Sequence, residues 1–207
     1  MKLLIAAATQ HEISPFLQSP LLRHTDVLIT GVGIAAATFQ LTKRLHHEHY
    51  DLVIQAGVAG TFSASYPLGS VVLAGQDCFG DAGAFENGQF QSLTDMGFST
   101  ELEWIHNSHP MLAQLQLPVV RAITVGTITN HPDYTNALRQ KYAPDIETME
   151  GAALHYVCQH LHKPYLQLRS ISNAVGERNK ELWELPAAIA NLNATLQQLV
   201  QHLKGAA

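Results

Sequence analysis

Uninterrupted apolar runs alternate along the chain with stretches in which apolar and polar positions mix at helical spacing. The first run occupies residues 2–8, and comparable runs lie at residues 26–30, 51–60, 69–75, 118–126 and 165–172. Short apolar runs of this kind are typical of strands that are buried on both faces of a sheet. Their alternation with helical stretches predicts an α/β fold, with ligands bound where the strands end in loops.

Glycine-rich turns and helices separate these runs. Gly31-Val-Gly33 is expected to lead into a helix that ends near His49, and residues 57–60 are expected to form a second glycine turn. Further helices are predicted at residues 132–142 and, as an amphipathic closing helix, at residues 180–204. Residues 77–117 are the least periodic part, so we expect loops and short hairpins there, where α/β enzymes often carry substrate-specific surface.

Residues 145–178 bring two polar side chains to one place. A strand leads to Glu150, a helix begins on that carboxylate, and the next strand ends at Asn173. We expect both side chains to face the same space, and Glu12 to join them if the first strand neighbours that of Asn173. Each also has a plain structural explanation: an acid at a helix start, a turn-forming amide and a solvated loop acid.

Composition limits the kinds of partner. The chain has 207 residues, 46% of them hydrophobic, which suits a single domain spanning residues 1–207. A formal charge of -5 leaves no basic field to attract nucleic acid or an anionic membrane. No apolar run approaches the ~20 residues of a membrane-spanning helix. We therefore expect a small-molecule ligand, with no nucleic acid and no membrane as partner.

The remaining candidate sites point away from metals and cofactors. Two cysteines make no disulfide framework, so a cytoplasmic protein is expected. Gly31-x-Gly33 partly matches the dinucleotide fingerprint, but Asp51 begins the following strand where the fingerprint needs an acid at its end. Surface positions without a metal are expected for the histidines, whose spacing does not fit a helical zinc site: His46, His47, His49, His155, His160 and His162.

With Met149-Glu150-Gly-Ala-Ala and Arg169-Ser-Ile-Ser-Asn173, the sequence resembles the purine nucleoside phosphorylase superfamily. Within it, the methylthioadenosine/S-adenosylhomocysteine nucleosidase branch is the most similar, and within that branch the futalosine hydrolase family. The likeness spans nearly the whole chain. It implies a three-layer, twisted mixed β-sheet surrounded by helices, and a homodimer or higher homo-oligomer in which a neighbouring subunit often completes the pocket.

The resemblance also implies roles for individual residues, and no cofactor. Glu12 would activate the attacking water, Glu150 would bind the ribose hydroxyls, and Asn173 would hydrogen-bond the departing purine. The other expected substrate-binding residues are Met149 against the sugar, Arg169, which helps to fix the site, Trp183 on the last helix, and Ala59 and Gly60.

Asn173 departs from the adenine-specific nucleosidases, which carry aspartate at this position. Adenine presents N7 as an acceptor and its amino group as a donor, whereas 6-oxopurines present two acceptors, N7 and O6. A protonated aspartate suits the first pattern, and the amide of Asn173 can donate to both acceptors of the second. Asn173 therefore predicts a hypoxanthine-type base.

A second departure concerns the nucleophile. Phosphorylases of the superfamily hold phosphate with arginines, one of them shortly before the segment that matches residues 57–60. No lysine or arginine occurs here between Arg44 and Arg121, so a phosphate dianion would lack its strongest donors from that region. We therefore expect water as the nucleophile.

The sequence thus predicts hydrolysis of the N-glycosidic bond of a 5′-modified 6-oxopurine nucleoside. The resemblance implies futalosine, cleaved to hypoxanthine and dehypoxanthine futalosine in menaquinone biosynthesis. The aromatic carboxylate of its 5′ tail would need a donor, for which Arg178 or residues 77–117 are candidates. An adenine-type nucleosidase, a nucleoside phosphorylase and a non-catalytic nucleoside-binding module remain open as alternatives.

Overall fold

The computed structural model describes residues 1–100 and 103–205, and most of its strands belong to one mixed sheet. The predicted apolar runs all form strands. The strands of this sheet are β1 (Leu3–Ala7), β2 (Asp26–Ile29), β3 (Leu52–Thr61), β4 (Val71–Asp77), β7 (Ile105–His106), β8 (Val119–Thr124), β9 (Ile146–Thr148) and β10 (Tyr165–Ala174).

Part of this sheet closes on itself. β3 and β10 pair in parallel along most of their lengths, from Tyr165 opposite Val53 to Ala174 opposite Thr61. β10 also pairs with β4, β4 with β8, β8 with β9, and β9 with β3, while β1 and β2 extend outward from β3. Five strands therefore form a ring, and the ends of β3 and β10 lie at its rim.

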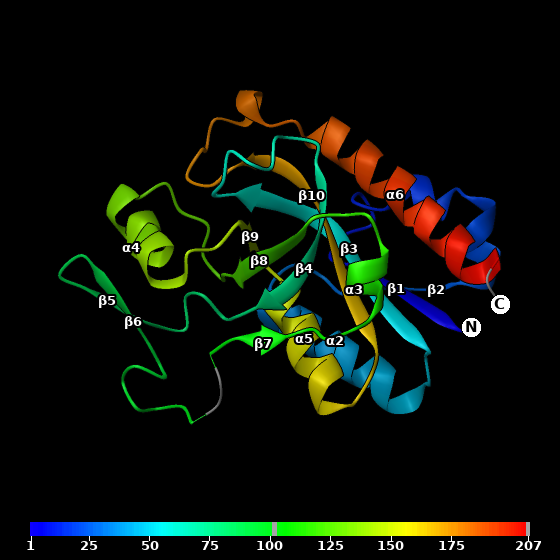
Figure 1. Ribbon diagram of the computed structural model, residues 1–207, viewed down its shortest axis with the longest axis horizontal. Coiled ribbons are helices and arrows are strands. Elements are labelled where there is room, and N and C mark those ends of the chain that lie inside the picture. Colours follow the sequence, from blue (N-terminus) through cyan, green and yellow to red (C-terminus); the bar gives the residue numbers. More distant parts are fainter. Residues whose placement is uncertain (101–102, 206–207) are drawn as a thin grey trace.

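Helices cover the sheet on both sides, which confirms the layered α/β architecture. α2 (Ile34–His47) and α5 (Gly151–His160) pack together on one side of the sheet, and α6 (Leu185–Gly205) lies along the other (Figure 1). Leu41 and Leu154 are buried in the first layer, and Leu192 and Leu196 in the second. The remaining helices are short or peripheral: α1 (Ser14–Leu17), η1 (Pro20–His24), α3 (Met111–Gln114), α4 (Pro132–Tyr142) and η2 (Lys180–Leu182).

The irregular segment at 77–117 forms short elements as expected, although residues 101 and 102 lie outside the described part. β5 (Gly83–Glu86) and β6 (Gln89–Ser92) make a separate hairpin, which stands beside α4 away from the main sheet (Figure 1). β7 and α3 follow it.

Two of the predictions about elements are wrong. Gly57 and Gly60 form no turn but lie inside β3, because close approach of other side chains requires glycine there: a Cβ at Gly57 would lie 2.2 Å from Nη1 of Arg169. The closing helix begins at Leu185 and not at residue 180, with Pro186 in its first turn, where proline is favoured. Trp183 consequently precedes this helix.

Within residues 1–100 and 103–205, none of the helices combines the length and the apolar character needed to cross a membrane.

Candidate active site

A cavity of about 280 Å³ opens where β1, β3 and β10 end. β3 lies between β1 and β10 and pairs with both, so Glu12 after β1 comes close to the strand of Asn173 without being its direct neighbour. Seven of the eight predicted site residues line this cavity: Glu12, Ala59, Gly60, Met149, Glu150, Asn173 and Trp183. Arg169 is the exception.

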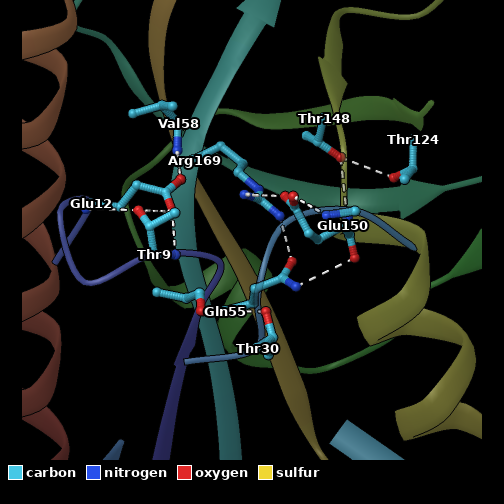
Figure 2. A network of polar contacts seen from close by, with 12 residues as sticks. Thr9, Glu12, Thr30, Gln55, Val58, Thr124, Thr148, Glu150 and Arg169 are labelled. Carbon is cyan, nitrogen blue, oxygen red and sulfur yellow. Dashed lines mark hydrogen bonds and ion pairs between the residues drawn. The ribbon is translucent and has the colours of Figure 1, made fainter. Parts of the chain in front are cut away.

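The Glu12 carboxylate is held from two sides. Oε2 accepts hydrogen bonds of 3.0 Å from both the backbone amide and the hydroxyl of Thr9, and Oε1 accepts one of 3.2 Å from the amide of Val58 (Figure 2). The backbone carbonyl of Glu12 also accepts from Asn193 on α6. Glu12 is therefore not the freely solvated loop acid of its alternative explanation, but a fixed acceptor at the cavity wall.

Glu150 is the N-cap residue of α5, yet its side chain does not cap that helix. Oε1 accepts a 2.9 Å hydrogen bond from the backbone amide of Gly33, where the second glycine of the Gly31-x-Gly33 turn has φ +93°. Burial raises the pKa of Glu150, an effect that the guanidinium of Arg169 and the Gly33 amide oppose. The glycine turn therefore donates a hydrogen bond to a carboxylate of the protein itself.

Two threonine hydroxyls, and not the Glu150 side chain, accept hydrogen bonds from the first backbone amides of α5. The amide of Gly151 donates to Oγ1 of Thr148 at 3.2 Å, and that of Ala152 donates to Oγ1 of Thr124 at 2.7 Å. The Thr124 hydroxyl in turn donates to the carboxylate of Asp77 at 3.0 Å. These bonds satisfy free amides of the first helical turn and leave the Glu150 side chain available to the cavity.

Asp77 is completely buried beneath this helix start. Its Oδ1 also accepts a 2.8 Å hydrogen bond from the amide of Cys78, and burial raises its pKa to about 7. Gly151 is needed above it, since a Cβ at that position would lie 2.2 Å from Oδ2 of Asp77 and 2.1 Å from Nε2 of Gln167. Sequence reasoning missed Asp77 because it lies in the segment that we expected to form loops.

Arg169 is buried and lies between Glu12 and Glu150 (Figure 2). Its guanidinium donates to Oε1 of Gln55, and Nη1 lies 4.0 Å from Oε2 of Glu150. Gln55 donates at 3.3 Å to the backbone carbonyl of Glu150. Arg169 thus positions the Glu150 turn and is not among the residues that line the cavity.

Asn173 is directed into the cavity by a bulge in β10. Ile171 pairs with Ala59 and Asn173 with Gly60, so Ser172 is the extra residue. The Ser172 hydroxyl donates to Oδ1 of Asn173 at 2.8 Å, and Nδ2 donates to the carbonyl of Ala174 at 2.9 Å. One amide hydrogen therefore remains free for a ligand, and donation to both N7 and O6 requires the bond to Ala174 to open.

Trp183 lines the cavity although it lies before α6. Its indole nitrogen donates at 3.1 Å to the carbonyl of Glu177, and the Arg178 guanidinium lies 5.6 Å from the centre of its ring. This arrangement places an exposed cation next to an aromatic wall of the cavity. None of the described lining residues comes from residues 77–117, so that segment does not supply the expected tail pocket at this wall.

Glu147 is a third cavity carboxylate that sequence reasoning missed. It lies on β9 opposite Gly60 of β3 and is half-buried. Its position three residues before Glu150 was the available signal, but a three-residue strand is too short to show which side chains face a cavity. Within the described chain, the cavity is therefore lined by Glu12, Glu147 and Glu150 and by neither lysine nor arginine.

The expectation of surface histidines is wrong for His155. This residue is completely buried on α5, with Nδ1 3.2 Å from the carbonyl of Ile105 and its ring against Tyr165, and burial lowers its pKa to about 4. Its helix packs on the sheet, which turns this position inward. The structure places the other histidines considered for metal binding at exposed positions, and no group of three or more candidate metal ligands occurs in residues 1–100 and 103–205.

Comparisons with known proteins show which proteins the chain is similar to. The family model of the phosphorylase superfamily matches residues 21–204. A futalosine hydrolase of Acidothermus cellulolyticus is 32% identical over 183 residues, which cover 82% of this chain and 74% of the relative. A futalosine hydrolase of Streptomyces coelicolor is 30% identical, with 86% and 80% of the two chains covered.

Solved structures show the same fold. The 5′-methylthioadenosine/S-adenosylhomocysteine nucleosidase of Helicobacter pylori, in complex with a pyrrolopyrimidine ligand, matches 98% of this chain and 98% of its own with a TM-score of 0.79 and 20% identity. The corresponding nucleosidase of Colwellia psychrerythraea, in complex with adenine, matches 97% of this chain and 95% of its own with a TM-score of 0.78 and 21% identity. The expected nucleoside phosphorylase-like fold is confirmed.

Proposed function

The chain belongs to the phosphorylase superfamily, among its futalosine hydrolases, and from this we propose that it hydrolyses the N-glycosidic bond of futalosine, releasing hypoxanthine and dehypoxanthine futalosine. The reaction would serve menaquinone biosynthesis. The protein is a nucleosidase, and a small nucleoside is its substrate.

One observation carries the choice of hydrolysis over phosphorolysis. Three carboxylates, Glu12, Glu147 and Glu150, line the cavity, and no lysine or arginine of the described chain does. A phosphate dianion beside the Glu12 and Glu150 carboxylates would be repelled by like charges, and none of the described residues that line the cavity is a lysine or arginine that could offset this repulsion. Water carries no such penalty, and this favours water as the nucleophile.

The mechanism follows from where the charges develop. Cleavage builds positive charge on the sugar and negative charge on the departing purine, so the carboxylates stabilise the first and hydrogen-bond donors the second. Glu150 accepts hydrogen bonds from the ribose hydroxyls, with Met149 packed against the sugar. Glu12, fixed by Thr9 and Val58, takes the proton of the attacking water.

Selectivity for the base is assigned to Asn173. The hydroxyl of Ser172 donates to Oδ1 of Asn173, which directs the amide nitrogen away from Ser172. Once its bond to the Ala174 carbonyl opens, that nitrogen donates to N7 and O6 of a 6-oxopurine lying against Ala59 and Gly60. This pattern disfavours adenine, whose 6-amino group is itself a donor.

The 5′ tail of futalosine carries an aromatic carboxylate, and we assign its partner to the Trp183 side of the cavity. Trp183 offers a flat apolar wall, and the Arg178 guanidinium beside it offers a charged donor. The alternative donor among residues 77–117 receives no support, since those residues do not line this cavity in the described chain.

We also propose a homodimer or higher homo-oligomer located in the cytoplasm. Val32 and Ile128 line the cavity and are 57% and 42% exposed, so apolar side chains lie at its open side, and Phe39 on α2 is 63% exposed. A second copy could bury them. The buried, unpaired thiols of Cys78 and Cys158 are consistent with a reducing compartment.

The proposal is tested by incubating the purified protein with futalosine, inosine and methylthioadenosine, with and without phosphate, and identifying the released base. We expect hypoxanthine from futalosine at a rate that phosphate does not change. A requirement for phosphate would make the protein a phosphorylase, and faster release of adenine would make it an adenine-type nucleosidase. Failure to cleave any of the three would favour a nucleoside-binding module.

A further inference from the structure

Glu147 is the cavity carboxylate that the mechanism above does not use. Its side chain makes no hydrogen bond with the described residues, unlike those of Glu12 and Glu150, and it lines the same cavity. A half-buried carboxylate without a hydrogen-bond partner is unfavourable, and protonation or a bound ligand removes this cost. Its place in the cavity therefore calls for a role toward the substrate.

The sheet register relates Glu147 to Asn173. Gly60 on β3 pairs with Asn173 of β10 on one side and with Glu147 of β9 on the other. Residues opposite each other on adjacent strands project their side chains to the same face. Because Gly60 has no side chain, a flat base can lie against it with Asn173 at one edge and Glu147 at the opposite edge.

Asn173 cannot complete the chemistry of the leaving group alone. Its amide donates a hydrogen bond to the N7 and O6 edge but gives up no proton, and Glu12 and Glu150 serve the water and the sugar. Building on the proposed function, we propose that Glu147 is the general acid of the reaction, which protonates N3 at the opposite edge of the departing hypoxanthine.

The bond between C1′ and N9 breaks and its electron pair stays on the purine, while the Glu147 proton moves to N3. The water oxygen joins C1′ and its proton passes to Glu12. Glu147 then regains a proton from solvent and Glu12 loses one, which returns the enzyme to its starting state.

The surroundings of Glu147 suit a proton donor near neutral pH. Burial, reinforced by the negative charge of Asp81, raises its pKa to about 7, and the cation of Arg178 opposes this shift. The other titratable groups around the cavity are Glu12, Glu150 and the exposed His11. A protonated Glu147 also spares the leaving purine anion a neighbouring negative charge.

Glu147→Gln tests the proposal, because glutamine keeps the shape of the side chain but cannot give up a proton. We expect kcat to fall about 100-fold or more while KM stays within about threefold. We also expect wild-type kcat/KM to decline above about pH 7, as Glu147 ionises, and this decline to be absent in the variant. Matching thermal unfolding curves would confirm that the variant is folded.

Asp81→Asn provides a second test, in which the pKa of Glu147 changes while Glu147 itself is kept. It removes the negative charge that raises the pKa of Glu147, while its side-chain oxygen can still accept from the amides of Gly126 and Thr127. The decline in kcat/KM should therefore move to lower pH, and this shift should vanish in the double variant with Glu147→Gln. A purely structural Glu147 would produce neither effect.

The outcomes separate this inference from the proposed function. Wild-type protein that cleaves another nucleoside but not futalosine would overturn the proposed substrate, and the variants would then be measured on the cleaved nucleoside. If Glu147→Gln keeps kcat within about threefold and retains the decline above pH 7, the general acid is overturned alone. A raised KM with unchanged kcat would likewise overturn it, leaving Glu147 a base-binding residue.

Discussion

The backbone amide of Gly33 donates a 2.9 Å hydrogen bond to Oε1 of Glu150, joining two turns that are 117 residues apart in the sequence. The turn after β2 thereby fixes the carboxylate at the start of α5. This bond involves one of the two oxygens of Glu150, and the other faces Arg169 at 4.0 Å. The position of the Glu150 carboxylate, which we propose binds the ribose, therefore depends on the backbone conformation of the distant glycine turn.

Gly33→Ala should weaken the site and the fold together. At φ +93° and ψ 163° Gly33 lies in a region that is essentially restricted to glycine, so an alanine costs about 1–3 kcal/mol of stability. Relaxation of the turn would withdraw its amide from Glu150 and raise KM. Gly97→Ala is the matched control, since Gly97 has φ +75° and lies outside the cavity lining. An equal KM in both variants would contradict the role of Gly33.

Gly57→Ala should separate Glu12 from Arg169. The added methyl group would lie 2.2 Å from Nη1 of Arg169 and 2.9 Å from Oε1 of Glu12, so both charged groups must move. We expect about 1–3 kcal/mol of destabilisation from overpacking and a fall in kcat/KM of about 100-fold. Gly126→Ala is the control, because its methyl would lie 3.6 Å from Asp81 in ordinary contact. Wild-type kinetics for Gly57→Ala would show that neither group needs its present position.

Local patterns in the sequence predicted most of the elements but not how they join. The apolar runs are strands, and residues 132–142 form the expected helix, because burial and helical periodicity are properties of short segments. The ring of β3, β9, β8, β4 and β10 depends on pairing between distant strands, which no local pattern records. The predicted turn at Gly57 and Gly60 is wrong for the same reason, since the side chains that approach these glycines come from distant parts of the sequence.

The sequence likewise predicted some residues of the candidate site and not others. Glu12 and Asn173 could be found because they lie at the carboxyl ends of the parallel strands β1 and β10, and Glu150 because it lies where β9 passes into α5. Arg169 was predicted among the substrate-binding residues as the one that helps to fix the site, and the structure buries it next to Glu150, outside the cavity lining. Asp77, Glu147 and the Gly33 amide were missed because their importance arises from neighbours that are far away in the sequence.

Glu12→Gln should preserve binding and remove turnover. Glutamine retains the shape and can still accept from the Val58 amide, but it is too weak a base to take a proton from water, so kcat should fall about 10²–10⁴-fold. Its amino group would face the donors of Thr9, so some loss of stability is also expected. Steady-state kinetics and a binding measurement with hypoxanthine give both quantities. Near-normal kcat would remove Glu12 from the role of general base.

Asn173→Asp should shift the preference toward adenine nucleosides. When protonated, an aspartate donates to N7 and accepts from the 6-amino group, while it loses the second donor that O6 requires. We expect the ratio of kcat/KM for methylthioadenosine over futalosine to rise about tenfold or more, equivalent to about 1.4 kcal/mol. Asn173→Ala serves as the control, because it loses base contacts without gaining the adenine pattern. An unchanged ratio in Asn173→Asp would contradict the base-edge argument.

Asp77→Asn should change how stability depends on pH. In the folded protein burial raises the pKa of Asp77 from 3.8 to about 7, so between these values the folded state binds more protons than the unfolded state. The Asp77 contribution to stability is therefore full below about pH 4, falls as pH rises to about 7, by up to about 1.4 kcal/mol per pH unit, and is constant above. Asparagine does not titrate and can keep the acceptor for Thr124.

His155 acts in the opposite direction, since burial lowers its pKa from 6.5 to about 4 and its contribution grows as pH rises through that window. The two effects partly cancel in the wild type, so the informative quantity is the difference between variant and wild type. Urea unfolding at several pH values should show Asp77→Asn gaining stability relative to wild type between pH 4 and 7. Asp95→Asn is the control, because Lys141 holds the pKa of Asp95 below its usual value of 3.8, so the difference between this variant and wild type should stay constant between pH 4 and 7 and change only at lower pH. A difference for Asp77→Asn that does not vary with pH would mean that Asp77 already ionises normally within the fold.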